Sequence, residues 1–236
     1  MKRVLGYVRK AVEDFNMIQD GDRIAVGISG GKDSMALLKA LKLYQYFAPV
    51  SFHLEAVTLT MGFDNFDVTP IEEFCRELNV PYTVVPTLIG KIIFEERKEK
   101  NPCSLCARMR RGAFHDAALK LGCKKTALGH NLDDTLETFF LSLFHEGRFN
   151  TFSPVTYLDR KDITVIRPLI YAPEPEIIGA VRRHNIPVVP SPCPAAGYTQ
   201  REEMKTLLRS LAKKIPNIRN QMLTALKSKH NRNLWD

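Results

Sequence analysis

The sequence predicts an α/β protein, in which a parallel sheet carries helices on both faces. A short β-branched run at 24–28 leads through two glycines into a run of strong helix formers at 35–41. Further strand-like runs alternate with helical stretches along the chain, at 52–59, 82–85 and 124–129. Strands that alternate with helices in this way pair in parallel, because each helix returns the chain to the same end of the sheet.

The segment between the first strand and the first helix has the composition of a phosphate-binding loop. It reads Ser29-Gly30-Gly31-Lys32-Asp33-Ser34, and we expect Asp33 or Ser34 to cap the helix. Glycines allow the backbone N–H groups to approach an anion, and the helix dipole favours its negative charge. A Walker loop would need Gly at position 26 and Ser or Thr at 33, where the chain has Val26 and Asp33. The loop therefore belongs to another class of phosphate site.

Composition and charge limit the classes of function. The chain has 236 residues and a formal net charge of +8, which favours a polyanionic partner. Apolar runs are too short to span a bilayer and the first residues lack a signal-peptide pattern, so we expect a cytoplasmic protein that is not bound to a membrane. Five cysteines in such a compartment argue for metal or redox chemistry rather than disulfides.

The remaining segments complete a division into three parts. We expect an amphipathic helix at 1–20, a nucleotide-binding domain at 21–200 and a basic helical extension at 201–236. Within the central part we expect a helix near 70–79, a loop at 146–162, a strand at 164–169, a helix at 174–184 and an extended, proline-rich segment at 187–194.

Three cysteines stand in unusual surroundings. Cys103 and Cys106 form a C-x-x-C pair before a helix that carries Arg108, Arg110 and Arg111. The positive charges of these arginines should lower the pKa values of the two thiols. Cys193 lies between prolines on a rigid segment. Such thiols can hold a metal, act as a redox dithiol or serve only as packed side chains. Cys75 lies in an apolar helix, and we expect it to be a core residue.

A second polar stretch follows the strand at 124–129. Gly129 and His130 end that strand, and Asp133, Asp134 and Glu137 open the next helix. One carboxylate alone would serve as a helix cap, but the three together suggest a magnesium site or a contact to the nucleotide. His130 is as readily a structural residue as a functional one.

The C-terminal part concentrates the positive charge. Residues 201–236 hold nine Lys and Arg against three Asp and Glu. A run of this kind is either a solvated helix face or a surface that binds RNA, and we favour RNA.

Five segments together resemble the tRNA 2-thiocytidine synthetase family, a branch of the PP-loop ATPases. These segments are SGGKDS, PCSLCARMRRG, ALGHNLDDTLETFFLSLF, VIRPLIY and the late Pro-Cys. The resemblance implies an adenine-nucleotide α-hydrolase fold that uses ATP and Mg²⁺ and thiolates C2 of a pyrimidine, most simply cytidine 32 in the tRNA anticodon loop. It also implies a 4Fe-4S cluster held by Cys103, Cys106 and Cys193.

Residue roles follow from the same resemblance. Ser29 to Ser34 would bind pyrophosphate, and the nucleotide contacts would include Thr58, Gly129, His130 and Asp133. Lys32, Asp133 and Arg110 would serve catalysis together with the three cysteines. The implied partners are tRNA, a sulfur donor such as a cysteine desulfurase or sulfide, and a second copy in a homodimer.

One departure keeps alternatives open. The family commonly has a second cysteine three residues after the late one, where this chain has Ala196. The alternatives are a tRNA 2-thiouridine synthetase, a lysidine-type or amidating PP-loop ligase, and a desulfidase that would not need ATP. A further alternative is a zinc-stabilised RNA-binding module without catalysis, in which the three cysteines act with His115 or His130.

Overall fold

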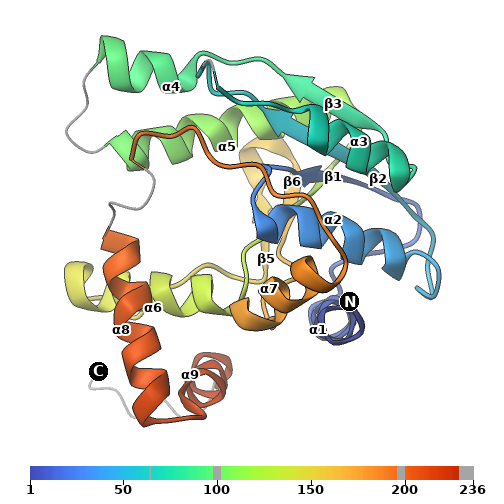
Figure 1. The fold of residues 1–236 in the computed structure, drawn as a ribbon. Helices are drawn as coiled ribbons and strands as arrows, with labels where there is room; N and C mark the ends of the chain where they lie inside the picture. The colour runs from blue at the N-terminus through green and yellow to red at the C-terminus, as the bar shows by residue number, and fades with distance from the viewer. Residues whose placement is uncertain (64, 98–101, 196–199, 229–236) are drawn as a thin grey trace. The chain divides into compact units, whose positions relative to one another are not determined.

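The computed structural model describes residues 1–63, 65–97, 102–195 and 200–228 (Figure 1). Its strands are β1 (Asp22–Gly27), β2 (Phe52–Leu59), β3 (Tyr82–Val85), β4 (Lys125–Ala127), β5 (Val155–Leu158) and β6 (Ile163–Ile166). Its α-helices are α1 (Lys2–Asp14), α2 (Lys32–Tyr44), α3 (Thr69–Glu77), α4 (Ile89–Lys91), α5 (Pro102–Lys120), α6 (Leu132–Glu146), α7 (Glu174–Arg183), α8 (Gln200–Lys214) and α9 (Ile218–Lys227). A π-helical turn, η1 (Ile92–Glu96), and a 3₁₀ turn, η2 (Asp159–Lys161), complete the described elements.

The six strands form one sheet in the order β3-β2-β1-β4-β6-β5. All neighbours are parallel except β5 and β6, which are antiparallel. The predicted α/β class is confirmed, but the prediction of a loop throughout 146–162 is wrong. Strand β5 has only four residues and exposes Tyr157, so its alternation is too short to detect in the sequence. Asp162, with φ 47°, closes the tight turn into β6.

Helices cover both faces of the sheet. Helix α5 packs on one face, where its Phe114 and Ala117 meet Ala25 and Val57 of the strands. Helices α1, α2 and α7 pack together and cover the other face (Figure 1). Alternate residues of β1 thus face different helices, and the central strand is buried on both sides, as its apolar sequence predicts.

The order of the strands produces a switch point next to β1. The chain leaves β1 toward β2 and β3, and returns to pair β4 with the opposite side of β1. Loops that leave the carboxyl ends of β1 and β4 therefore diverge to opposite sides and leave a crevice, which is the usual ligand position in such sheets. The glycine loop at 29–34 and the Gly129-His130 pair both lie at this edge.

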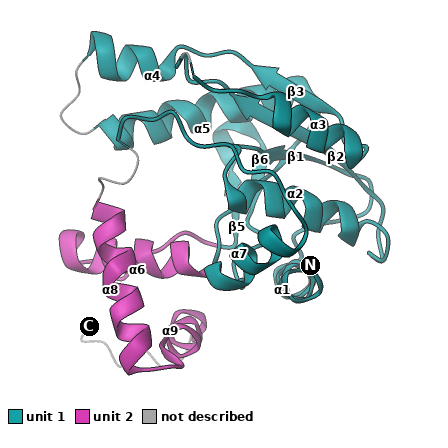
Figure 2. Ribbon diagram, viewed as in Figure 1, with its two compact units in different colours: residues 1–131, 154–196 teal, residues 132–153, 197–236 magenta. Residues whose placement is uncertain are grey.

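The described chain divides into two compact units (Figure 2). Unit 1 comprises residues 1–131 and 154–196, and unit 2 comprises 132–153 and 197–236. Unit 2 has its own apolar core, in which Leu132, Leu136 and Phe140 of α6 contact Met204 and Leu208 of α8. The N-terminal helix groups with the sheet in unit 1 and α6 groups with the C-terminal helices in unit 2, while the division at residues 20 and 200 stays a prediction. No helix among the described residues is long and apolar enough to cross a membrane.

Candidate functional site

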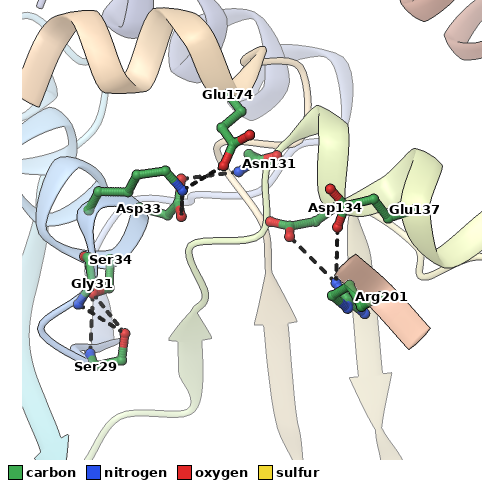
Figure 3. Close-up of polar contacts among 10 residues, drawn as sticks. Ser29, Gly31, Asp33, Ser34, Asn131, Asp134, Glu137, Glu174 and Arg201 are labelled. Carbon is green, nitrogen blue, oxygen red and sulfur yellow. Dashed lines mark hydrogen bonds and ion pairs between the residues drawn. The ribbon is translucent and has the colours of Figure 1, made fainter. Parts of the chain in front are cut away.

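The glycine loop is held in shape by hydrogen bonds within itself. Gly30 has φ +78°, in the left-handed region that glycine tolerates best. The hydroxyl of Ser34 donates to the Gly31 carbonyl at 2.9 Å and accepts from the Ser29 N–H at 3.2 Å (Figure 3). Gly31 is the N-cap and α2 begins at Lys32, so the prediction that Asp33 or Ser34 caps the helix is wrong. Ser34 instead bonds back to the cap from inside the first turn.

Two other segments of the backbone lie close to this loop. The nitrogen of Val189 donates to the Gly30 carbonyl at 2.9 Å, which ties the loop to the segment that carries Cys193. On the other side, a Cβ added to Gly129 would lie 3.0 Å from the Ser34 nitrogen. The loop after β4 therefore needs glycine to pass this close to the start of α2.

Lys32 lies between two carboxylates. Its Nζ is 2.7 Å from Asp33 Oδ2 and 2.9 Å from Glu174 Oε1. The Asn131 side chain donates to the other oxygen of Asp33 at 3.0 Å, so Asp33 is held from both sides (Figure 3). Burial by itself would lower the pKa of Lys32, but the charges and hydrogen bonds of Asp33 and Glu174 outweigh it and raise that pKa. Lys32 is thus a cation within the loop, and its two carboxylate partners stabilise its charged form.

A cavity of about 560 Å³ opens beside the loop. Ser29, Gly31, Asp33 and Ser34 line one part of it, and Gly129 and His130 line another. Opposite them, α5 contributes Cys106, Arg110 and Arg111, and the proline-rich segment contributes Cys193. The structure thus brings most of the predicted loop, strand-end and cysteine residues to one cavity of unit 1.

The three predicted cysteines lie near one another. Burial raises the pKa of the Cys106 thiol, Arg110 opposes this rise, and the nearby thiols of Cys193 and Cys103 add to it. Arg110 lowers the pKa of Cys106 as predicted, but desolvation is stronger, so the net pKa of this thiol is raised. Cys103 is exposed and Cys193 partly buried. Among the described residues, no group of three or more His, Cys, Asp or Glu is arranged around a common metal position.

Other predicted residues lie elsewhere. Thr58 is fully buried and does not line the cavity, whereas its neighbours Val57 and Leu59 do. Cys75 is buried in α3, in agreement with its predicted core role, and burial raises its pKa to about 12. Ala196 lies outside the described residues.

The acidic stretch at the start of α6 belongs to unit 2 and forms ion pairs there. Asp133 accepts from Arg219 at 2.7 Å, and Arg201 lies 3.5 Å from Asp134 and 3.9 Å from Glu137 (Figure 3). These pairs join α6 to α8 and α9. These contacts give the three carboxylates a structural role within unit 2, and the magnesium site or nucleotide contact suggested by the sequence stays a prediction.

Sequence reasoning missed several residues at the cavity and loop. Glu174 is far from Lys32 in the sequence and lies in a helix with no motif of its own, so its role needs the fold. Phe63, Phe66 and Phe94 form an aromatic wall of the cavity, and the rings of Phe63 and Phe94 are 6.0 Å apart. The repeated Phe in 63–66 was the available signal. His115, which the sequence suggested only as a ligand of the alternative zinc-stabilised module, also lines the cavity; it is almost fully buried, and burial lowers its pKa.

Comparison with known proteins agrees with this geometry. The family model described as PP-loop domain matches residues 5–208. The chain is 42% identical to a tRNA-cytidine(32) 2-sulfurtransferase of Pelobacter propionicus, over 100% of this chain and 88% of that protein. It is also 42% identical to the protein of that name from Geobacter sulfurreducens, over 100% of this chain and 93% of that protein.

One solved structure extends the comparison. The U34-tRNA thiolase NcsA from Methanococcus maripaludis with its [4Fe-4S] cluster is 25% identical and has a TM-score of 0.78, with 96% of this chain and 77% of that chain covered. The predicted adenine-nucleotide type of fold is confirmed by this likeness and by the family match. The chain belongs to the PP-loop family and, within it, to the family of the tRNA-cytidine(32) 2-sulfurtransferases.

Proposed function

We propose that this chain is an ATP-dependent tRNA sulfurtransferase that replaces the C2 oxygen of cytidine 32 by sulfur. One observation carries the proposal: the glycine loop shares a single cavity with Cys106, Cys193 and Arg110. A phosphate site and a thiol site in the same cavity are what an activation step followed by sulfur transfer requires. The names of the full-length relatives supply the target base.

The loop would serve the activation step. The C2 oxygen of the base attacks the α-phosphorus of ATP, an O–P bond forms, and the bond to pyrophosphate breaks. The preorganised N–H groups of residues 29–34 and the ammonium of Lys32 stabilise the charge that develops on the departing pyrophosphate. The poor oxygen leaving group thereby becomes AMP. Magnesium would accompany the ATP phosphates, as in other phosphoryl-transfer sites.

The cysteines would serve the sulfur step. Hydrosulfide adds to C2, the C2–O bond breaks, AMP leaves, and loss of the proton gives the C2 thione. Three neighbouring cysteines provide soft sulfur ligands, which iron–sulfur clusters prefer, although among the described residues they are not closed around a common metal position. Cys103, Cys106 and Cys193 would hold a 4Fe-4S cluster, which would supply iron chemistry for binding and delivering sulfide. A desulfurase or free sulfide would be the donor.

RNA recognition would use basic side chains. Arg110 and Arg111 line the cavity and would meet the phosphates beside the target base. The base must unstack before its C2 atom can meet ATP and the sulfur donor. Unstacking costs less free energy in an anticodon loop than in a stem. A tRNA substrate would also place the protein in the cytoplasm.

The proposal is tested with purified protein, tRNA, ATP and sulfide under anaerobic conditions. We expect release of AMP and pyrophosphate in equal amounts, dependent on tRNA, and one thiolated base per AMP. Lys32→Ala should abolish pyrophosphate release, and Cys106→Ala should abolish thiolation. Thiolation that proceeds without ATP consumption would contradict the proposal and favour a different reaction class.

A further inference from the structure

Glu174 contacts the lysine of the loop from outside the loop motif. Its Oε1 is 2.9 Å from Lys32 Nζ, and the residue is 8% exposed. A buried carboxylate is costly unless it is paired, and the Lys32 ammonium beside Glu174 supplies that partner. Helix α7 begins at Glu174, and the positive end of the helix dipole further favours the charge.

The position of Glu174 is fixed by the packing of α7. This helix packs on α1 and α2, and Glu176 near its start accepts from Arg3 of α1 at 2.6 Å. Helix α7 contacts α2, which carries Lys32, more extensively than it contacts α1. Glu174 therefore meets Lys32 through two helices that pack on each other, and Figure 3 shows its carboxylate next to Asp33 and Asn131.

The two carboxylates beside Lys32 differ in origin. Asp33 belongs to the loop motif and also accepts a hydrogen bond from Asn131. Glu174 comes from a different helix and adds a second negative charge. One carboxylate already neutralises the ammonium, and a second one makes the local charge around Lys32 unfavourable to an incoming anion.

We propose that Glu174 is a positioning residue that competes with pyrophosphate for Lys32 and so promotes release of this product. The inference rests on the proposed function, since it takes residues 29–34 as the pyrophosphate site. Before ATP binds, Glu174 keeps the ammonium charged and in place. After the bond between the α-phosphorus and pyrophosphate breaks, the same carboxylate pairs with Lys32 again as pyrophosphate leaves. Tight product binding is thereby avoided.

The test measures the affinity of the full-length protein for inorganic pyrophosphate by calorimetry. Glu174→Gln keeps the shape of the side chain and removes its charge, so affinity should rise about tenfold, the scale of one charge-assisted hydrogen bond. Turnover should become limited by pyrophosphate release, with KM for ATP and kcat both lowered. Glu176→Gln removes the same charge from the same helix end but faces Arg3, and should leave the affinity unchanged.

A background variant separates the inference from the proposed function. In Lys32→Ala protein, pyrophosphate affinity should be low and Glu174→Gln should no longer change it. Wild-type protein that does not bind pyrophosphate would overturn the loop assignment itself. Binding that depends on Lys32 but is unchanged or weakened by Glu174→Gln would overturn only the competition. A thermal melt of each variant checks that a weakened affinity does not come from unfolding.

Discussion

Replacing Gly30 by alanine tests how the phosphate loop is built. Gly30 has φ +78°, and a Cβ there would lie 2.9 Å from Val189 Cβ and 3.4 Å from Ile71 Cδ1. A left-handed residue with a side chain costs about 1–2 kcal/mol. Inserting a methyl into a packed site costs about 1–3 kcal/mol more. Gly30→Ala should therefore lower the free energy of unfolding by about 2–5 kcal/mol.

The same change should weaken ATP binding, because relief of the clash must move either the loop or the Val189 segment. Urea denaturation gives the stability, and calorimetric titration gives the ATP affinity. Gly6→Ala is the matched control: nothing lies within 4 Å of its added Cβ, and alanine in the middle of α1 should stabilise by about 0.5–1 kcal/mol. A Gly30→Ala protein with normal stability and ATP affinity would refute the role given to this backbone.

Three further predictions concern ion pairs, thiols and RNA. Arg219→Ala removes the ion pair that Arg219 makes at 2.7 Å with the buried carboxylate of Asp133 and should destabilise unit 2 by roughly 3 kcal/mol in urea denaturation; unchanged stability would contradict a structural role for the pair. Arg110→Ala removes the charge that lowers the pKa of Cys106, so that pKa should rise further and alkylation of Cys106 at pH 8, read by peptide mass spectrometry, should slow; an equal or faster rate would argue against the contact. Lys213→Ala, at an exposed position of α8, should reduce the slope of log K against log salt for tRNA binding by about 0.7 to 0.9, and an unchanged slope would mean that this charge is only solvated.

The sequence was informative where the signal is local. The run at 52–59 coincides with β2, and the strand, glycine loop and helix at 24–41 have the predicted form, because β-branched residues, glycines and helix formers act on their own neighbours. The Cys106 and Cys193 assignments also meet at one cavity, which the motif resemblance anticipated.

Partners that are distant in the sequence could not be predicted. Glu174 reaches Lys32 only because α7 packs beside α2, and Asp133 is engaged by Arg219 only because α9 packs on α6. Neither arginine nor glutamate carries a local pattern that specifies its partner. The raised pKa of Cys106 has the same origin, since desolvation depends on what the fold places around a thiol and not on the arginine one turn away.

Mass spectrometry of tRNA nucleosides tests the central claim most directly. In a strain that lacks this chain, 2-thiocytidine should be absent from tRNA, and the wild-type gene on a plasmid should restore it. Cys106→Ala and Lys32→Ala should each fail to restore it at normal protein levels. Undiminished 2-thiocytidine in the deletion strain, or loss of 2-thiouridine in its place, would contradict the proposed reaction at cytidine 32.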